Sequence, residues 1–243
     1  MTQVERESQT SGPVLTRKRL LIVAAAAYLV FLVAFGFMAA TADEFPGEAD
    51  VSDWVQSWRT SWLDTTMKGI SAPGSTMVAL PLSLAVLAGL FVYGRRIEAV
   101  VVLVATGSST VMNSALKEII ARPRPTSDVV EVLQEFDGFS FPSGHVTYYV
   151  VFLGTLVAVL TSPMAATATR TLILVLAAMT LLAIGVSRIY LGAHYWADVV
   201  GGYALGAAVV AVSVVIHRLV SVNLAQHETE SATLPNRESV TDT

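Results

Sequence analysis

The chain has 243 residues, of which 53% are hydrophobic and 14% are charged, and it contains no cysteine. A soluble domain carries about 25% charged residues, so this composition is typical of an integral membrane protein. It excludes extensive disorder, a disulfide scaffold and a thiolate metal site. The net charge of −4 gives no reason to expect nucleic acid as a partner.

Six apolar segments are long enough, or nearly long enough, to cross a bilayer as helices, which takes about 20 residues. They cover residues 20–40, 77–94, 99–116, 146–162, 171–186 and 199–216. The sequence therefore predicts an all-α integral membrane protein with six transmembrane helices. A soluble protein with buried helices is the alternative, but this much apolar sequence would then need a very large core.

The first segment has two interpretations. It follows the basic run Arg17-Lys18-Arg19, and Ala40-Thr41-Ala42 resembles the cleavage site of a signal peptide. The apolar run is longer than the roughly 7–15 residues of a signal-peptide core. We expect a retained membrane anchor, with cleavage as the alternative.

Basic residues near the membrane predict the orientation. Threading six helices places one group of them on the same side: Arg17, Lys18, Arg19, Arg95, Arg96, Arg170 and Arg218. The positive-inside rule makes that side cytoplasmic. Both termini are then cytoplasmic, and the loops after the first, third and fifth helices face outward from the plasma membrane. The polar tails 1–16 and 222–243 are predicted to be disordered cytoplasmic segments that flank a membrane domain of residues 17–221.

The first outer loop has its own pattern. Val51, Trp54, Val55, Trp58 and Trp62 recur at helical spacing, which predicts an amphipathic helix at the membrane interface, where Trp is favoured. Plain packing against the bundle is an equally good interpretation.

Three polar clusters lie at the predicted outer ends of helices. The first contains Lys117 and Arg124-Pro125, the second is Pro142-Ser143-Gly144-His145, and the third is Ser187-Arg188 followed by His194 and Asp198. The three cations match phosphate oxygens, and the Ser143 hydroxyl and the amides near Gly144 add donors at a helix N-terminus. Other charged residues nearby are interpreted as interface anchors or loop residues outside the site: Arg122, Glu118, Asp128, Glu131 and Asp137.

Two of the four histidines complete this set. His194 and Asp198 are four residues apart, so on a helix they share a face, where the carboxylate orients the imidazole and leaves its other nitrogen free to attack. His145 is free to protonate a leaving oxygen. Cations, nucleophile and acid together predict phosphoryl transfer. His217 and His227 are interpreted as membrane-exit and tail residues, and Gly202 and Gly206 predict a close helix contact.

The motif Lys117-x6-Arg124-Pro125, followed by Pro142-Ser143-Gly144-His145 and by Ser187-Arg188-x5-His194-x3-Asp198, resembles the three-part signature of the type 2 phosphatidic acid phosphatase superfamily. The resemblance covers roughly residues 53–217 and the six-helix layout. It implies that His194 is the nucleophile of a phosphohistidine intermediate, that Asp198 orients it, and that His145 is the general acid. The phosphate-binding residues that it implies are Lys117, Arg124, Ser143, Gly144 and Arg188.

The resemblance also implies a metal-independent lipid phosphatase without a cofactor, acting on a membrane lipid phosphate at the extracytoplasmic face. A polyprenyl (undecaprenyl) diphosphate is the first expectation for the substrate, and phosphatidic acid or phosphatidylglycerol phosphate is the alternative. A non-enzymatic transporter and a vanadium haloperoxidase are the competing functions. The lipid and the oligomeric state are left open by the sequence.

Overall fold

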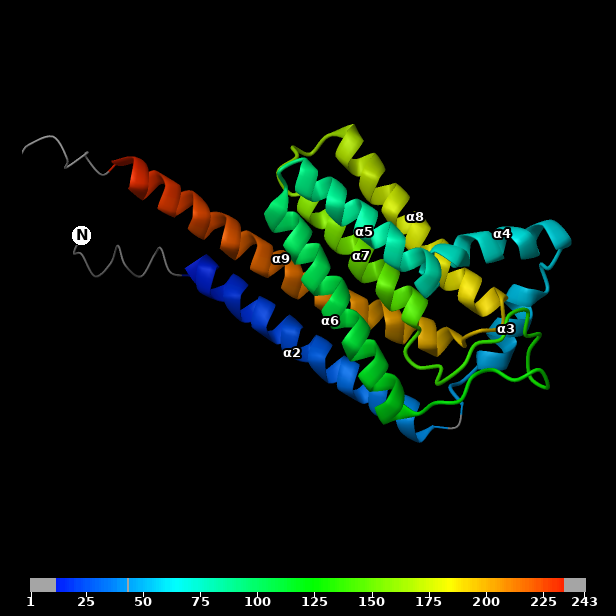
Figure 1. Cartoon of the computed structure of the whole chain (residues 1–243). Helices are drawn as coiled ribbons and strands as arrows, with labels where there is room; N and C mark the ends of the chain where they lie inside the picture. Colours follow the sequence, from blue (N-terminus) through cyan, green and yellow to red (C-terminus); the bar gives the residue numbers. More distant parts are fainter. Residues whose placement is uncertain (1–11, 43, 234–243) are drawn as a thin grey trace, which may run out of the picture.

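A computed structural model describes residues 12–42 and 44–233, and over these residues the regular structure is entirely helical, as predicted. Long helices run side by side, while the short helices and the long loops gather at one end of the molecule (Figure 1). The elements are α2 (Gly12–Thr41), α3 (Glu48–Gln56), α4 (Ser61–Ser71), η1 (Ala72–Gly74), α5 (Thr76–Val92), α6 (Arg96–Ile120), α7 (Gly144–Thr161), α8 (Ala168–Tyr190) and α9 (Trp196–Thr233).

Five of the described helices, α2, α6, α7, α8 and α9, are each long and apolar enough to cross a membrane. The predicted second segment corresponds to α5, which has only 17 residues. It qualifies as a span only together with α4 and η1, from which it is bent by 57°. The described residues therefore contain five candidate spans, or six if the bent pair is counted as one broken span.

Several helices extend past the predicted apolar segments into the polar clusters. Lys117 lies in the last turn of α6, and Arg188 lies in the last turn of α8. Gly144 opens α7, as predicted, and Asp198 lies in the first turn of α9. Hydropathy marks only the apolar part of a helix, so the terminal turns that carry the polar residues fall outside it.

The structure also differs from the predicted tails. Helix α2 begins at Gly12 and α9 continues to Thr233, so residues 12–16 and 222–233 are helical. Residues 1–11 and 234–243 lie outside the described residues, as does the His227 side chain.

Helix α7 occupies the centre of the bundle and packs against α6, α8 and α9. The Gly202/Gly206 prediction is confirmed, because a Cβ atom at Gly206 would lie 2.6 Å from Val150 Cβ on α7. The start of α2 and the end of α9 lie at the end of the molecule opposite the long loops (Figure 1). Tyr28 Oη ties α2 to α9 by donating to the Ala204 carbonyl at 2.6 Å.

The first outer loop forms two short helices, α3 and α4, where the sequence predicted an amphipathic helix at the interface. The chain leaves the helical path at residues 57–60, and Thr60 caps α4 by accepting the Leu63 N–H. Trp54, Trp58 and Trp62 are all exposed, whereas the opposite side of α3 packs against α8 and α9. Helix α3 therefore packs on the bundle, while Trp54 on α3, Trp58 in the break and Trp62 on α4 stay exposed.

Candidate active site

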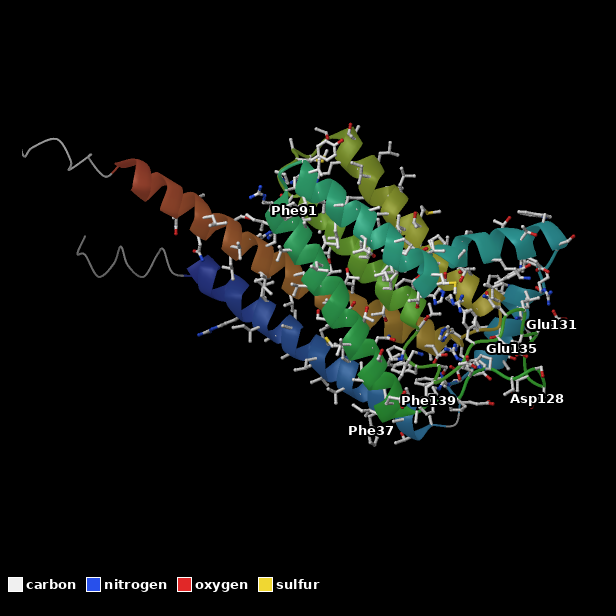
Figure 2. All side chains as sticks on the ribbon, viewed as in Figure 1. Phe37, Phe91, Asp128, Glu131, Glu135 and Phe139 are labelled. Atoms are coloured by element: carbon white, nitrogen blue, oxygen red, sulfur yellow. The ribbon has the colours of Figure 1, made fainter. Side chains whose placement is uncertain are left out.

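The three predicted clusters meet at one end of the bundle, at the helix ends where α6, α7, α8 and α9 converge. Phe139, from the loop between α6 and α7, lies at this end together with Asp128, Glu131 and Glu135, while Phe91 lies at the opposite end (Figure 2). A large cavity, called the main cavity below, is lined by most of the predicted site residues, namely Lys117, Arg124, Gly144, His145, Arg188 and His194. Residues from three segments far apart in the sequence therefore surround one space.

His194 does not lie on a helix, as the spacing predicted, but in the turn before α9, which begins at Trp196. Its Nδ1 nevertheless lies 3.4 Å from Asp198 Oδ2, and its Nε2 lies 3.3 Å from Arg124 Nη1. Because a guanidinium can only donate, Nε2 must be the acceptor. The ring proton is therefore assigned to Nδ1, on the side of Asp198.

His194 is almost fully buried. Burial lowers the pKa of His194 to about 3, against the opposing effect of Asp198 and with a further lowering from Arg188 and Arg124. The imidazole is therefore neutral near pH 7, and its Nε2 lone pair is available as a nucleophile.

Asp198 is held from three sides besides that of His194. Its Oδ1 accepts hydrogen bonds from Arg122 Nη1 at 2.8 Å and from Ser140 Oγ at 3.2 Å, and its Oδ2 accepts the Tyr195 N–H at 3.0 Å. The carboxylate is completely buried. It is thus fixed in position and cannot turn away from the histidine without losing these bonds.

Arg122 is not the interface anchor that the sequence suggested. Its side chain is only 2% exposed and bridges Asp198 and Glu48. Burial disfavours its charge, but hydrogen bonding to Glu48 and the charge of Asp198 outweigh this and raise the pKa of Arg122. Arg122 is therefore a buried, charged partner of the site.

The three predicted phosphate-binding cations are held by different partners. Lys117 Nζ donates to the carbonyls of Phe139 and Ser140. Arg124 donates to the carbonyls of Gly138 and Ala193 at 3.0 and 2.9 Å. Backbone carbonyls neutralise no charge, so both cations keep their attraction for an anion.

His194 Nδ1 makes no hydrogen bond among the described residues, although it faces Asp198 Oδ2 at 3.4 Å. Two further predicted residues hold buried donors with no partner among the described residues. They are Ser143 Oγ and, on Arg188, Nε and Nη2, whereas Arg188 Nη1 donates to Ser71 Oγ. A buried donor without a partner is unfavourable by about 1–3 kcal/mol. A tetrahedral oxyanion offers several acceptors, which suits the donors of Arg188 on the cavity lining and of Ser143 next to Gly144.

His145 lies in the first turn of α7, with its ring against Phe136 and Gly74. It separates two spaces, since it lines both the main cavity of about 700 Å³ and a smaller cavity of about 420 Å³. Among the described residues, no hydrogen bond to its ring is found. Its nitrogens are therefore free to exchange a proton with a bound group.

The main cavity has a polar end and an apolar end. From the site it continues between α5 and α6, where its lining includes Leu80, Leu84 and Leu103. Each of these three leucines is more than half exposed on the surface of the described helices. The cavity therefore connects the cations to the apolar outer surface of the bundle, which suits an amphiphilic ligand.

Sequence reasoning missed three residues besides Arg122. Phe136 places its ring against Arg124, Arg188 and His145. Asn113 donates to the Pro142 carbonyl and to Thr147 Oγ1, which fixes the segment before α7. The third is Glu48, the partner of Arg122. Asn113 alone carried a signal, since it is an amide inside an apolar helix.

Of the four acidic residues expected in loops, Asp128, Glu131 and Asp137 lie in the segment between α6 and α7, but Glu118 lies in α6. His217, the predicted membrane-exit residue, lies in α9. Across the described residues, no group of three or more acidic or histidine side chains is placed to hold a metal ion.

Comparisons with known proteins identify the family of this chain. Residues 98–221 match the PAP2 superfamily. Phosphatidylglycerophosphatase B of Bacillus subtilis (strain 168) is 31% identical over 193 residues, which cover 74% of this chain and 87% of that protein.

Two solved structures are similar. The crystal structure of a transmembrane PAP2 type phosphatidylglycerolphosphate phosphatase from Bacillus subtilis has a TM-score of 0.66 and 28% identity, covering 76% of this chain and 92% of that one. LpxE of Aquifex aeolicus has a TM-score of 0.58 and 24% identity over 71% of this chain and 97% of that one, which shows a common fold. The chain thus belongs to the PAP2 superfamily, as a multi-pass membrane lipid phosphatase.

Proposed function

We propose that the protein removes the terminal phosphate of phosphatidylglycerol phosphate or a closely similar lipid through a phosphohistidine intermediate on His194. The observation that carries this proposal is the set of buried, unpartnered donors on Ser143 and Arg188 beside a neutral His194. Arg188 and His194 line the polar end of a cavity whose other end is apolar, and Ser143 directly precedes Gly144 of the same lining. That combination suits a phosphate attached to a membrane lipid.

In the first step, the lone pair of His194 Nε2 attacks phosphorus and forms a P–N bond. The P–O bond to the lipid breaks, and His145 gives a proton to the departing oxygen, which leaves as an alcohol. Lys117, Arg124 and Arg188 stabilise the charge on the equatorial oxygens in the transition state, with Ser143 and the amide of Gly144 as neutral donors. Asp198 stabilises the positive charge that the phosphorylated imidazole acquires.

In the second step, water attacks phosphorus while His145 accepts one of its protons. The P–N bond breaks, its electron pair returns to Nε2, and inorganic phosphate leaves. His145 acts as acid and then as base, so both histidines are restored at the end of the cycle. No residue in this scheme requires a metal ion.

The comparisons favour phosphatidylglycerol phosphate over the polyprenyl diphosphate that the sequence first suggested. The Bacillus subtilis relative and the similar Bacillus subtilis structure are both named for phosphatidylglycerol phosphate, and no residue here points specifically to a polyprenyl chain. The positive-inside pattern supports an extracytoplasmic site and cytoplasmic termini, with residues 17–221 as the catalytic membrane domain.

The experiment measures phosphate release by the purified full chain in detergent, without added metal. Phosphatidylglycerol phosphate, phosphatidic acid and undecaprenyl diphosphate are compared by kcat/KM on one preparation. We expect phosphatidylglycerol phosphate to be the best substrate. A higher kcat/KM for undecaprenyl diphosphate would overturn this choice of lipid but not the reaction.

A variant tests the reaction itself. His194→Ala removes the nucleophile and is expected to lower kcat by at least about a thousandfold. His217→Ala is the matched control, because His217 lies on α9 outside the cavity lining. Full activity in His194→Ala would contradict the proposed mechanism.

A further inference from the structure

A buried row of alternating charges leads from the first outer loop to the candidate nucleophile. Glu48 Oε2, in the first turn of α3, accepts a hydrogen bond from Arg122. Arg122 donates in turn to Asp198 Oδ1 at 2.8 Å, and Asp198 Oδ2 lies 3.4 Å from His194 Nδ1. None of these four side chains is more than 2% exposed. One continuous electrostatic connection therefore joins α3 to the site.

Glu48, Arg122 and Asp198 all lie behind the lining of the main cavity, which among the described residues includes only His194 of the four. Neither Glu48 nor Arg122 is placed to touch a bound substrate. Any influence that they have on the reaction must pass through Asp198.

The pair is also held firmly. The Arg122 guanidinium lies between the rings of Phe45 and Tyr195, 5.1 and 5.3 Å from their centroids. Glu48 Oε2 additionally accepts the Phe45 N–H at 2.8 Å. Buried ion pairs contribute little net stability compared with apolar side chains of similar volume, so stability alone gives no reason for this arrangement.

The chemistry of the site supplies a reason. The Asp198 carboxylate interacts electrostatically with both Arg122 and His194. Its interaction with His194 matters most when the phosphorylated imidazole is positively charged. Without a second anion, the positive charge of Arg122 would offset the negative charge of Asp198 and weaken its stabilisation of His194 at every stage of the cycle. Glu48 gives Arg122 a second anion and so leaves more of the Asp198 charge for His194.

We infer that Glu48 is a positioning residue, which balances the charge of Arg122 and thereby sets how strongly Asp198 stabilises phosphorylated His194. This role rests on the proposed function of His194 as the nucleophile. It makes the first outer loop part of the catalytic apparatus, although it contributes no group that contacts the substrate.

The test compares isosteric variants of the full chain in detergent. Glu48→Gln keeps the shape of the side chain but removes its charge, so kcat is expected to fall about tenfold while KM changes little. Glu48→Asp keeps the charge and is expected to restore much of the lost kcat. Asp50→Asn is the matched control, because it removes one negative charge from an exposed position of the same helix.

A double variant separates charge balance from a merely structural role. Glu48→Gln with Arg122→Met removes both charges, while Asp198 keeps its bonds from Ser140 and Tyr195. With no competing cation, the double variant is expected to have a higher kcat than Glu48→Gln alone. A structural role predicts the reverse, because the second substitution would add to the damage.

The outcomes distinguish this inference from the proposed function. If wild type hydrolyses no lipid phosphate, the proposed function fails and this role fails with it. If wild type is active but Glu48→Gln matches Asp50→Asn, or the double variant is slower than Glu48→Gln, only the role of Glu48 is overturned. Thermal unfolding of each variant shows whether a loss of kcat is accompanied by a loss of folded protein.

Discussion

The placement of His145 depends on a residue without a side chain. A Cβ atom on Gly74 would lie 2.5 Å from His145 Cδ2 and 3.0 Å from Tyr149 Cε2. Gly74→Ala therefore has to displace the imidazole of the proposed general acid. Misplacing a catalytic group by about 1 Å reduces rates by up to about a hundredfold, so we expect kcat to fall by roughly ten- to a hundredfold.

The control for this prediction is Gly69→Ala in α4, where a Cβ atom would meet nothing within 4 Å. Steady-state kinetics of both variants on one lipid phosphate make the comparison. An unchanged kcat in Gly74→Ala would show that His145 has room to move or does not act as the acid.

Local spacing predicted the residues that face the cavity but not the residues behind them. The motif residues were easy to identify because each lies at the end of an apolar segment, where charged residues are rare. They come together in space because those helix ends lie at the same end of the bundle (Figure 1). Arg122 pairs with Asp198 and Glu48 across 76 and 74 residues of sequence. No periodicity links such distant positions, and in isolation a basic residue at a membrane boundary is typical of an anchor.

At the scale of elements, the pairing of α5 with α6 determines the access of a lipid chain to the site. Gly107 on α6 lines the main cavity, and a Cβ atom there would meet nothing within 4 Å. Gly107→Leu extends a side chain into the cavity from a position where its Cβ atom meets no neighbour. We expect kcat/KM to fall about tenfold for a long-chain lipid phosphate and much less for a short-chain, water-soluble one.

Gly89→Leu on α5 is the matched substitution, because Gly89 has open space around it but does not line this cavity. The kcat/KM values of the two variants with the two chain lengths show whether the lipid chain lies in the main cavity. An equal loss with both chain lengths would place the lipid chain elsewhere.

Element boundaries were the part of the fold that hydropathy described least well. The predicted fifth segment ended at residue 186, but α8 continues to Tyr190 and so carries Arg188 in its last turn. The tryptophans of the outer loop suggested one helix, and the chain breaks it at residues 57–60 because Thr60 begins a new cap. A cap is a local hydrogen bond that an apolar pattern cannot reveal.

At the scale of the whole molecule, apolar segment counting predicted the all-helical bundle and the convergence of the site at one end. Loop charge predicted that three distant clusters share a face, and they do. Neither the apolar segments nor the loop charges predicted the bent pair of α4 and α5. The bend at residue 75 brings η1 against His145, so a feature of overall topology also serves the site.

The unpartnered donors of Ser143 and Arg188 have a consequence for folding as well as for binding. A bound oxyanion accepts hydrogen bonds from these buried donors, so anion binding is coupled to the stability of the folded state. A ligand at one hundred times its dissociation constant stabilises the folded state by about 2.7 kcal/mol. We therefore expect saturating orthophosphate or vanadate to raise the melting temperature by about 5–10 °C over chloride of equal ionic strength, and Ser143→Ala to show a smaller rise. An unfolding temperature insensitive to both anions would mean that these donors are satisfied in some other way.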